Sequence, residues 1–376
     1  MSKVLIIIPW FDPAFKAGGP VQSIANLVST FNEAVQYKIF CGNKDVDGSL
    51  LENIKTDSWV EYNNNTQIWY DSTNHPFRTF KNILSDFNPD ILFIIGLFSY
   101  KYNILPLLLC KSQKKILSVR GMLHKGALSQ KWLKKKIFIS FLKIFSITKK
   151  VFFHATDENE AKIVRNVFGD KSKVYIAGNF PKKITAEIPI NKKRNELSLV
   201  TIALVSPMKN HLLILSALKE IKDNIEYHII GAIKDKDYWQ QCMKIINELP
   251  GNIKVTYHGE VTPKEVINYL NDEHVFIMPS KSENFGHAII EALSAGKPVI
   301  TSHNTPWNNL QENKAGLNVS LNVAEIKIAI DHFIKMSSEE YIEWSDAAVS
   351  FSKKAIDYKQ LNIQYENMFL DNQFIN

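Results

Sequence analysis

Short runs of apolar, strand-forming residues alternate with segments of helical periodicity along the whole chain. This alternation is typical of repeated βαβ units, which build parallel sheets covered by helices. In the first half the predicted strands are residues 3–8, 37–41, 91–96, 115–119, 151–154 and 174–177. In the second half they are residues 198–205, 226–231, 253–259, 275–279 and 298–301. The pattern therefore predicts an α/β protein with two doubly wound sheets.

A stretch rich in Lys, Pro and Asn, residues 179–195, separates the two sets of strands and is the predicted linker. We divide the chain into an N-terminal Rossmann-like domain (1–182) and a C-terminal Rossmann-like domain (183–352). A helical segment (353–376) is expected to pack back on the N-terminal domain. A length of 376 residues suits two domains. Ligands of such sheets bind at the carboxyl ends of the strands.

Composition narrows the class of protein. With 45% hydrophobic and 22% charged residues, the chain is expected to be compact and soluble. The apolar run 4–8 is cut by Pro9, so it is interpreted as a buried strand rather than a signal peptide. No run approaches the roughly 18 to 20 apolar residues of a membrane span, and the longest candidate, 137–147, contains Lys143.

The cysteines and the net charge bear on location and partners. Cys41, Cys110 and Cys242 lack metal-ligand spacing and are interpreted as buried free thiols, which suits a reducing cytoplasm. A net charge of +7 and a pI near 9.0 favour anionic partners. Nucleic acid is not expected among them, because no recognised binding motif accompanies the lysines.

Residues 131–143 are first basic and then strongly apolar. A helix of this composition can lie on an anionic membrane through its apolar side. Its apolar positions also wrap most of the helix, which favours burial with a solvated basic end. Both interpretations stay open, so peripheral contact with the inner face of the cell membrane is one of two expectations.

The segment 282–302 places charged and glycine positions where a predicted strand, 275–279, passes into a predicted helix. The helix is expected to run from about residue 285 or 286 to residue 295. Gly296 is a natural cap at its C-terminal end.

Ser282, Glu283 and Asn284 are predicted to cap the start of this helix. Free backbone N–H groups and the helix dipole favour an anion at such a start. The segment therefore predicts a place for a ligand that carries phosphate.

Two glutamates of this segment, Glu283 and Glu291, have seven residues between them. If both were helical they would lie roughly 12 Å apart, whereas carboxylate pairs for glycoside hydrolysis stand about 5 to 9.5 Å apart. We therefore give them separate roles: Glu283 contacts sugar hydroxyls, and Glu291 accepts hydrogen bonds from a ribose. The alternative is a capped surface helix with two solvated glutamates.

Gly18 and Gly19 follow the first strand and precede a helix that Pro20 can begin. Glycines in such a turn let backbone N–H groups approach a phosphate. They can equally serve only to turn the chain, and the residues alone leave both interpretations open.

The segment PSKSENFGHAIIEALSAGKPVITS resembles the signature of the retaining glycosyltransferases of family 4. The resemblance extends over nearly the whole chain and is strongest from about 198 to 320. Its further motifs are Gly18-Gly19, Ser118 to Leu123, Gly231, His258 to Val261, Thr305 to Trp307 and Ala315 to Leu317.

The resemblance implies the GT-B fold, in which two Rossmann-like, doubly wound domains face a central cleft. It also implies transfer of a sugar from a UDP- or GDP-sugar to a glycan or lipid-linked acceptor of a bacterial surface, without a metal or cofactor. A nucleotide-sugar epimerase of the same architecture is the alternative enzyme. A binder of membrane or nucleic acid without enzymatic activity is suggested by charge alone.

The resemblance also assigns roles to residues. Lys209 matches the lysine that holds the donor diphosphate, but the arginine that commonly precedes it is absent, and Arg120 is a candidate substitute. An ordinary solvated lysine or surface histidine remains the alternative at Lys209 and His124. The expected catalytic residues are Glu283, Lys209, Arg120 and His124. The expected donor-binding residues are Gly18, Gly19, Ser206, Gly259, Val261, Asn284, Phe285, Gly286, His287 and Glu291.

Overall fold

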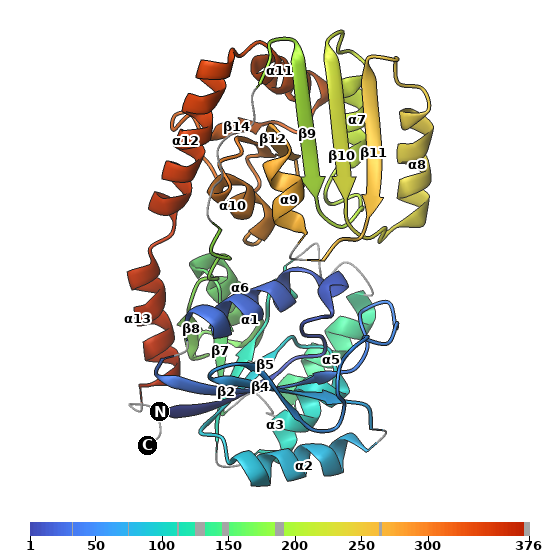
Figure 1. Ribbon diagram of the computed structural model, residues 1–376. Helices are drawn as coiled ribbons and strands as arrows, with labels where there is room; N and C mark the ends of the chain where they lie inside the picture. Colours follow the sequence, from blue (N-terminus) through green and yellow to red (C-terminus); the bar gives the residue numbers. More distant parts are fainter. Residues whose placement is uncertain are drawn as a thin grey trace. The chain divides into compact units, whose positions relative to one another are not determined.

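The computed structural model describes residues 1–31, 33–73, 75–110, 113–124, 132–144, 150–184, 192–262 and 265–371 (Figure 1). The chain divides into two compact units. Unit 1 comprises Met1–Phe180 with Asp357–Asn376, and unit 2 comprises Pro181–Ile356. The divisions lie at 180/181 and 356/357, beside the expected 182/183 and 352/353.

Unit 1 contains an eight-stranded sheet in the order β3-β4-β2-β1-β5-β6-β7-β8. Every neighbouring pair is parallel except β3 and β4, which pair antiparallel. The strands are β1 (Ser2–Ile7), β2 (Val35–Gly42), β3 (Trp59–Asn63), β4 (Thr66–Asp71), β5 (Ile91–Ile95), β6 (Lys114–Ser118), β7 (Val151–Ala155) and β8 (Val174–Ile176). The six predicted strands correspond to β1, β2 and β5 to β8, whereas β3 and β4 were not predicted.

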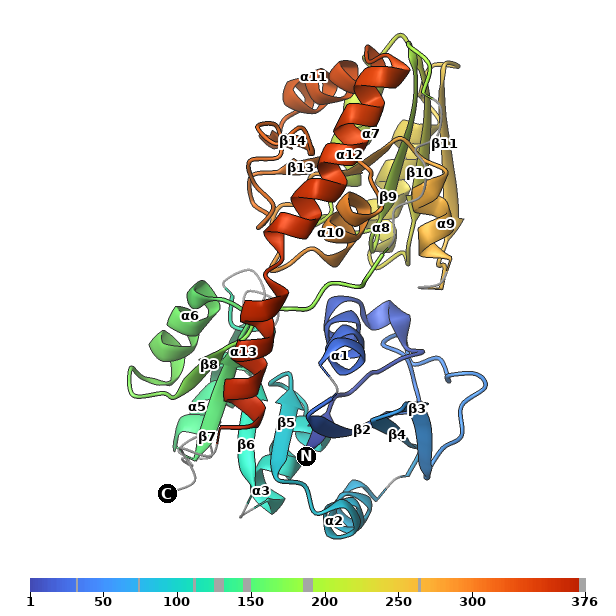
Figure 2. The ribbon, with the colours of Figure 1, turned by 60° about the vertical axis from the view of Figure 1, so that its left-hand side comes forward.

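Helices cover both faces of this sheet (Figure 2). They are α1 (Gly19–Thr30), α2 (Pro76–Phe87), α3 (Leu105–Leu109), α5 (Trp132–Ile144), α6 (Glu158–Phe168) and α13 (Tyr358–Phe369), with the short turns η1 (Phe15–Ala17) and η2 (Tyr100–Ile104). Successive residues of a strand point to opposite faces. Val4 and Ile6 of β1 therefore pack in one core with α1 and α13, while Leu5 and Ile7 pack in a second core with α2, α3, α5 and α6. The C-terminal helix thus packs within unit 1.

Unit 2 contains a six-stranded parallel sheet in the order β11-β10-β9-β12-β13-β14. Its strands are β9 (Glu196–Ile202), β10 (Asn224–Ile230), β11 (Ile253–Gly259), β12 (Val275–Met278), β13 (Val299–Ser302) and β14 (Gly316–Val319). Its helices are α7 (His211–Leu218), α8 (Lys236–Ile246), α9 (Val266–Asn271), α10 (His287–Ser294), α11 (Val323–Ile334) and α12 (Ser338–Ala355). The predicted α/β class with two Rossmann-like sheets is confirmed.

Cys41, Cys110 and Cys242 are free and buried, as predicted. Burial raises the pKa of the Cys110 and Cys242 thiols to about 12, and it raises the pKa of Cys41 as well. Within the described ranges, no helix combines the length and the apolar character that crossing a membrane requires.

Candidate functional site

The carboxyl edge of the unit 2 sheet is formed around two neighbouring strands, β9 and β12. The segment after β9 carries Lys209, and the segment after β12 carries Glu283. Because the two strands are parallel and adjacent, these segments emerge side by side at one edge. Backbone bonds join them, since the Lys281 N–H donates to the Met208 carbonyl at 2.9 Å.

Lys209 and Glu283 are brought into contact although 74 positions separate them in the sequence. The Lys209 Nζ donates to Glu283 Oε1, and the two side chains are only 21% and 11% exposed. The backbone N–H of Lys209 also donates to the carbonyl of Ser206, a buried residue, at 3.0 Å. The alternative of a freely solvated lysine is therefore wrong.

Helix α10 begins after Gly286, whose left-handed backbone has φ 76° and ψ 60°. A Cβ at this position would lie 3.2 Å from Ile289 Cδ1 and 3.3 Å from Trp307 Nε1, so a side chain is disfavoured by backbone and by space. The helix ends at Ser294, close to the predicted end, and Gly296 follows it with φ 75°.

The predicted side-chain cap of α10 is wrong. The N-cap residue is Gly286, and no side chain makes a capping hydrogen bond there. Glu283 does not cap, because its carboxylate is engaged by Lys209 and its backbone N–H donates to the Asn304 carbonyl at 3.2 Å. Among the described residues the start of α10 therefore has no side-chain cap, which keeps the positive end of its dipole suited to an anion.

Glu291 lies on α10 and is buried, with 9% of its surface exposed. Burial raises the pKa of its carboxyl to about 7 from an ordinary value of 4.5, and the charge of Lys182 opposes this rise. The interpretation of Glu291 as a solvated surface glutamate is therefore wrong. The two glutamates of the segment have distinct surroundings, one ion-paired and one buried.

This burial predicts a pH-dependent stability. The raised pKa in the folded state means that the folded protein holds a proton at Glu291 between about pH 4.5 and 7 that the unfolded chain has released. Stability from this group is complete below pH 4.5 and is lost as the pH rises through 7, by about 3 kcal/mol. Glu291→Gln removes this loss. We expect the difference in unfolding free energy between parent and variant, measured in urea at pH 5 and pH 8, to change by most of that amount.

The exposed Glu312 of the same unit supplies the control, because Glu312→Gln removes a carboxylate that already contacts solvent. Its pH profile should run parallel to that of the parent. Parallel profiles for Glu291→Gln would show instead that the buried carboxyl does not titrate as described.

Aromatic side chains support the turn before α10. The Phe285 ring meets Trp307 edge-on at 5.2 Å between centroids and lies 4.7 Å from the His287 ring. The Trp307 indole N–H donates to the Phe285 carbonyl. Trp307 is only 5% exposed, so the Phe285 ring packs against a buried side chain. The sequence did not predict the contact of Trp307 with Phe285, although Trp307 belongs to the motif Thr305 to Trp307 noted above.

Two glycines end the neighbouring strands of unit 2. Gly231 follows β10 with φ 137°, and a Cβ there would lie 2.1 Å from the Ala203 carbonyl oxygen, so only glycine fits. Gly259 ends β11 with φ 73° and has open space where a Cβ would be. Val261 follows and packs partly buried against the core beside α10. Gly259 and Val261 thus lie at the carboxyl edge, where the sequence placed them.

In unit 1, Gly18 is the N-cap of α1, with φ 75°, and Gly19 is its first residue. Nothing lies within 4 Å of a Cβ built on either glycine, so the backbone here is openly accessible. Nearby, Lys16 forms an ion pair with Asp47 at 2.8 Å. The glycines are therefore placed where a ligand can approach the backbone.

Arg120 follows β6 in a left-handed conformation, with φ 46°. Its Nη1 donates to Asn179 Oδ1, and its charge and a side-chain hydrogen bond oppose the rise in the pKa of the buried Tyr365. His124 closes the same turn, since its backbone N–H donates to the Gly121 carbonyl at 3.1 Å. Among the described residues, the buried His124 Nε2 has no hydrogen-bond partner. Among the described residues, this loop therefore keeps one ring nitrogen of His124 available to a ligand.

Sequence reasoning missed the residue that fixes this loop, Glu160 of α6. Its Oε1 accepts from the Gly121 N–H at 2.5 Å, and its Oε2 accepts from the Thr156 N–H at 2.7 Å. Glu160 is 1% exposed. In the sequence it looks like an ordinary acidic residue in the first turn of a helix, so no pattern signalled this role.

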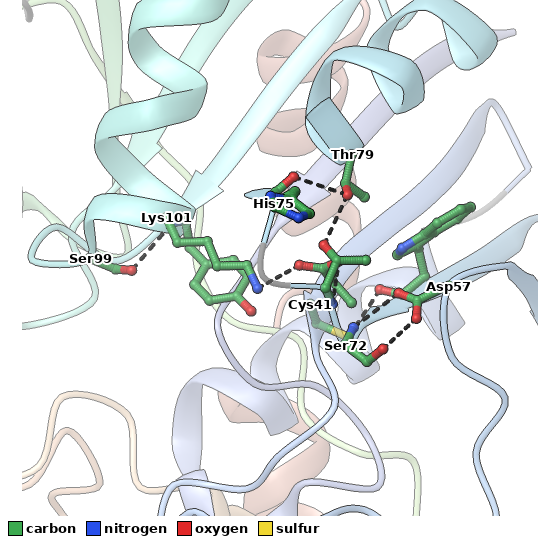
Figure 3. A network of polar contacts seen from close by, with 11 residues as sticks. Cys41, Asp57, Ser72, His75, Thr79, Ser99 and Lys101 are labelled. Atoms are coloured by element: carbon green, nitrogen blue, oxygen red, sulfur yellow. Dashed lines mark hydrogen bonds and ion pairs between the residues drawn. The ribbon is translucent and has the colours of Figure 1, made fainter. Parts of the chain in front are cut away.

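A second polar network lies where β2 and β4 end in unit 1 (Figure 3). Lys101 Nζ lies 2.5 Å from Asp71 Oδ2, and the Asp71 side chain is fully buried. The Thr73 hydroxyl donates to Asp71 Oδ1 at 2.7 Å and contacts the Thr79 hydroxyl at 3.0 Å. This network was not predicted from the sequence either.

The described residues contain no group of three or more His, Cys, Asp or Glu side chains arranged to hold a metal ion. Positive groups near α10 include the Lys209 ammonium, the charge of Lys182 and the uncapped helix start. This arrangement can neutralise an anion at the carboxyl edge of the unit 2 sheet.

The sequence is similar to known glycosyltransferases over part of its length. Residues 183–350 match the family model of the glycosyl transferases group 1. The capsular polysaccharide biosynthesis glycosyltransferase CapH of Staphylococcus aureus is 28% identical over 184 residues, which cover 48% of each chain. The 2-deoxystreptamine N-acetyl-D-glucosaminyltransferase of Niallia circulans is 32% identical over 92 residues, covering 24% of this chain and 23% of that protein. The chain thus spans at most about half the length of these two relatives.

Solved structures resemble the chain over almost its full length. Sucrose-phosphate synthase from Thermosynechococcus elongatus superposes with a TM-score of 0.76 at 14% identity, covering 98% of both chains. Anabaena HepE in complex with UDP and glucose superposes with a TM-score of 0.69 at 14% identity, covering 98% of this chain and 99% of that one. Residues 183–350 are therefore similar to the glycosyl transferases group 1, and the chain as a whole shares the two-domain fold of these solved structures.

Proposed function

We propose that the chain is a retaining glycosyltransferase that moves a sugar from a UDP- or GDP-sugar to a hydroxyl of a bacterial surface glycan or a lipid-linked acceptor. The observation that carries the proposal is the Lys209–Glu283 pair beside the uncapped start of α10. The relatives support it, because CapH is named for capsular polysaccharide biosynthesis and HepE binds UDP and glucose. The buried thiols suit the cytoplasmic location that we include in the proposal.

The chemistry that we propose is electrostatic. When the bond between the anomeric carbon and the diphosphate breaks, negative charge develops on the departing oxygen. The Lys209 ammonium and the α10 dipole offset that charge where it appears, which is an effective form of catalysis. The acceptor oxygen bonds to the anomeric carbon on the same face, and its proton passes to the departing diphosphate. We propose that no protein nucleophile and no metal take part.

The remaining roles follow from the surroundings of each residue. Glu291 is proposed to accept hydrogen bonds from the ribose. Its carboxyl is buried, so few water molecules compete for those bonds. Glu283 is proposed to orient Lys209 and to contact the sugar, together with the 284–286 backbone. Arg120 and His124 lie in the loop after β6 of unit 1, and their action at the sugar stays a prediction.

Nucleotide binding tests this proposal directly. We expect one of UDP, GDP and ADP, at about 100 times its dissociation constant, to stabilise the protein by about 2.7 kcal/mol. That stabilisation raises the melting temperature by several degrees, at roughly 2 to 4 °C per kcal/mol. Glu291→Ala should lose the shift, while Glu312→Ala keeps it. A full shift in Glu291→Ala would contradict the ribose role.

Product analysis separates transfer from the predicted alternative, a nucleotide-sugar epimerase, which the comparisons do not support. The nucleotide-sugar of the identified nucleotide is incubated with the protein, with and without a glycan acceptor. Transfer produces an acceptor-linked sugar with retained anomeric configuration. A changed nucleotide-sugar in the absence of acceptor would overturn the transferase proposal, and an inverted product would overturn retention.

A further inference from the structure

Arg120 has a strained backbone at the carboxyl end of β6. Its φ of 46° lies in the left-handed region, which residues other than glycine rarely adopt. Such a conformation persists only where the surroundings fix it, and it is found most often at functional sites. The Glu160 carboxylate fixes the backbone on one side, because it accepts the N–H of the next residue, Gly121.

Two residues that are distant in the sequence hold the Arg120 side chain. Its Nη1 donates to Asn179 Oδ1, 59 positions further along the chain. Tyr365 of α13 makes a second side-chain hydrogen bond with Arg120. Asn179 is 6% exposed and Tyr365 is 1% exposed, so water competes little for either contact. The guanidinium is therefore held from two separate segments of unit 1.

Buried hydrogen bonds fix Asn179 relative to β6. The Ser118 hydroxyl, two residues before Arg120, lies 2.7 Å from His154 Nδ1, and His154 Nε2 lies 2.9 Å from the Ala177 carbonyl. A carbonyl only accepts, so Nε2 carries the proton and Nδ1 accepts from the Ser118 hydroxyl. Burial and the charge of Arg120 lower the pKa of His154 to about 3, so its ring stays neutral. Because Ala177 is two residues before Asn179, these bonds join both ends of the Arg120–Asn179 contact.

Helix α13 packs on the unit 1 sheet and thereby fixes Tyr365 (Figure 2). The Tyr365 ring stacks on the Phe180 ring, with 5.3 Å between centroids. The neighbouring Gln364 accepts the Gly178 N–H with its Oε1 at 3.0 Å. The C-terminal helix therefore supports the chain on both sides of Asn179.

Both partners of the guanidinium are neutral. Asn179 carries an amide, and burial raises the pKa of Tyr365, which keeps its hydroxyl protonated. The two contacts therefore fix the guanidinium without cancelling its charge. We infer that Asn179 and Tyr365 are positioning residues, which hold Arg120 with its charge intact for an anionic ligand at the carboxyl edge of the unit 1 sheet. The catalytic use of that charge rests on the proposed function, whereas the anchor itself does not.

Nitrogen-15 NMR of the full chain tests the anchor without any assay of activity. The chain has four arginines, so the Arg120 side-chain signals can be assigned by their loss in Arg120→Lys. We expect slow guanidinium rotation in the parent, seen as separate Nη signals, and loss of that separation in Tyr365→Phe and in Asn179→Leu. Tyr358→Phe is the matched control, because it removes a hydroxyl from the same helix and its ring stacks on the same Phe180. Equal rotation in Tyr365→Phe and Tyr358→Phe would overturn the inference.

Transfer kinetics test what the anchor does. Tyr365→Phe should lower kcat by up to about 100-fold, the loss expected for a misplaced group, with a smaller change in KM. Tyr358→Phe should keep the parental kcat. A purely structural role would lower the melting temperature of Tyr365→Phe and leave the kcat of the folded enzyme unchanged, and this result would overturn the positioning role.

Asn179→Asp separates the position of Arg120 from its charge. Its carboxylate keeps an acceptor for the guanidinium, so slow rotation should persist, but it offsets the positive charge, so kcat should stay low. A parental kcat in Asn179→Asp would overturn the claim that the intact charge is used. A parent that transfers no sugar would instead refute the proposed function, and the NMR comparison would still decide whether the anchor holds Arg120.

Discussion

Lys209→Met should lower kcat for sugar transfer by about 10²- to 10³-fold, the loss expected when one preorganised electrostatic contact is removed. The reason is that the departing diphosphate gains charge during the reaction, so Lys209 contributes more in the transition state than in the bound donor. We therefore expect a fall in kcat larger than the rise in KM. Initial rates at saturating nucleotide-sugar, with acceptor present, measure both.

The ion pair with Glu283 complicates this variant, because Lys209→Met leaves a carboxylate that is only 11% exposed without its partner. Stability should therefore fall as well. The double variant Lys209→Met with Glu283→Gln removes the unpaired charge, so it should recover stability but not activity. Lys236→Met, at an exposed lysine of the same unit, is the matched control and should keep both. A rate within threefold of the parent for Lys209→Met, in a folded protein, would refute the electrostatic role.

The sequence predicted those parts of the fold that depend on continuous apolar runs. Strands buried on both faces, such as β5 and β12, read as uninterrupted apolar segments. Strand β3 is half-buried along its length, and β4 mixes Thr, Gln and Asp with its apolar residues, so neither run stood out. Strand β14 has only four residues and includes an Asn. These strands are defined by their neighbours in the sheet more than by their own composition.

The residues of the candidate site likewise comprise some that could be predicted from the sequence and some that could not. The local feature Gly296 after α10 could be predicted, because the turn itself demands a glycine, whereas Gly286 was expected to begin the helix and instead lies before it as the N-cap. The contact of Glu283 with Lys209 could not, since it depends on β9 and β12 being neighbours in the sheet. That contact also explains the wrong cap, because the Glu283 carboxylate pairs with Lys209 and makes no capping hydrogen bond. Buried carboxylates such as Glu160 and Asp71 left no local signal at all.

The largest loss of stability is expected for Lys101→Met in unit 1. Asp71 is fully buried, and Lys101 Nζ at 2.5 Å is its cationic partner (Figure 3). Among the described residues, removing Lys101 leaves a buried charge that only the hydroxyl and amide donors of Thr73 reach. Breaking a buried pair in this way costs about 3 to 5 kcal/mol, which lowers the melting temperature by roughly 6 to 20 °C. Thermal unfolding of the full chain measures it.

The two partners should not be equivalent, and this asymmetry is the sharper test. Lys101 remains 27% exposed, so in Asp71→Asn its charge can still be hydrated, and the Asn carbonyl can keep the Thr73 hydroxyl bond. Asp71→Asn should therefore cost less than Lys101→Met, and the double variant should recover part of the loss. Lys16→Met breaks an ion pair whose partners both contact solvent, so its melting temperature should stay close to that of the parent. If Asp71→Asn proved the more damaging change, the buried carboxylate would owe its stability to the threonine bonds rather than to Lys101.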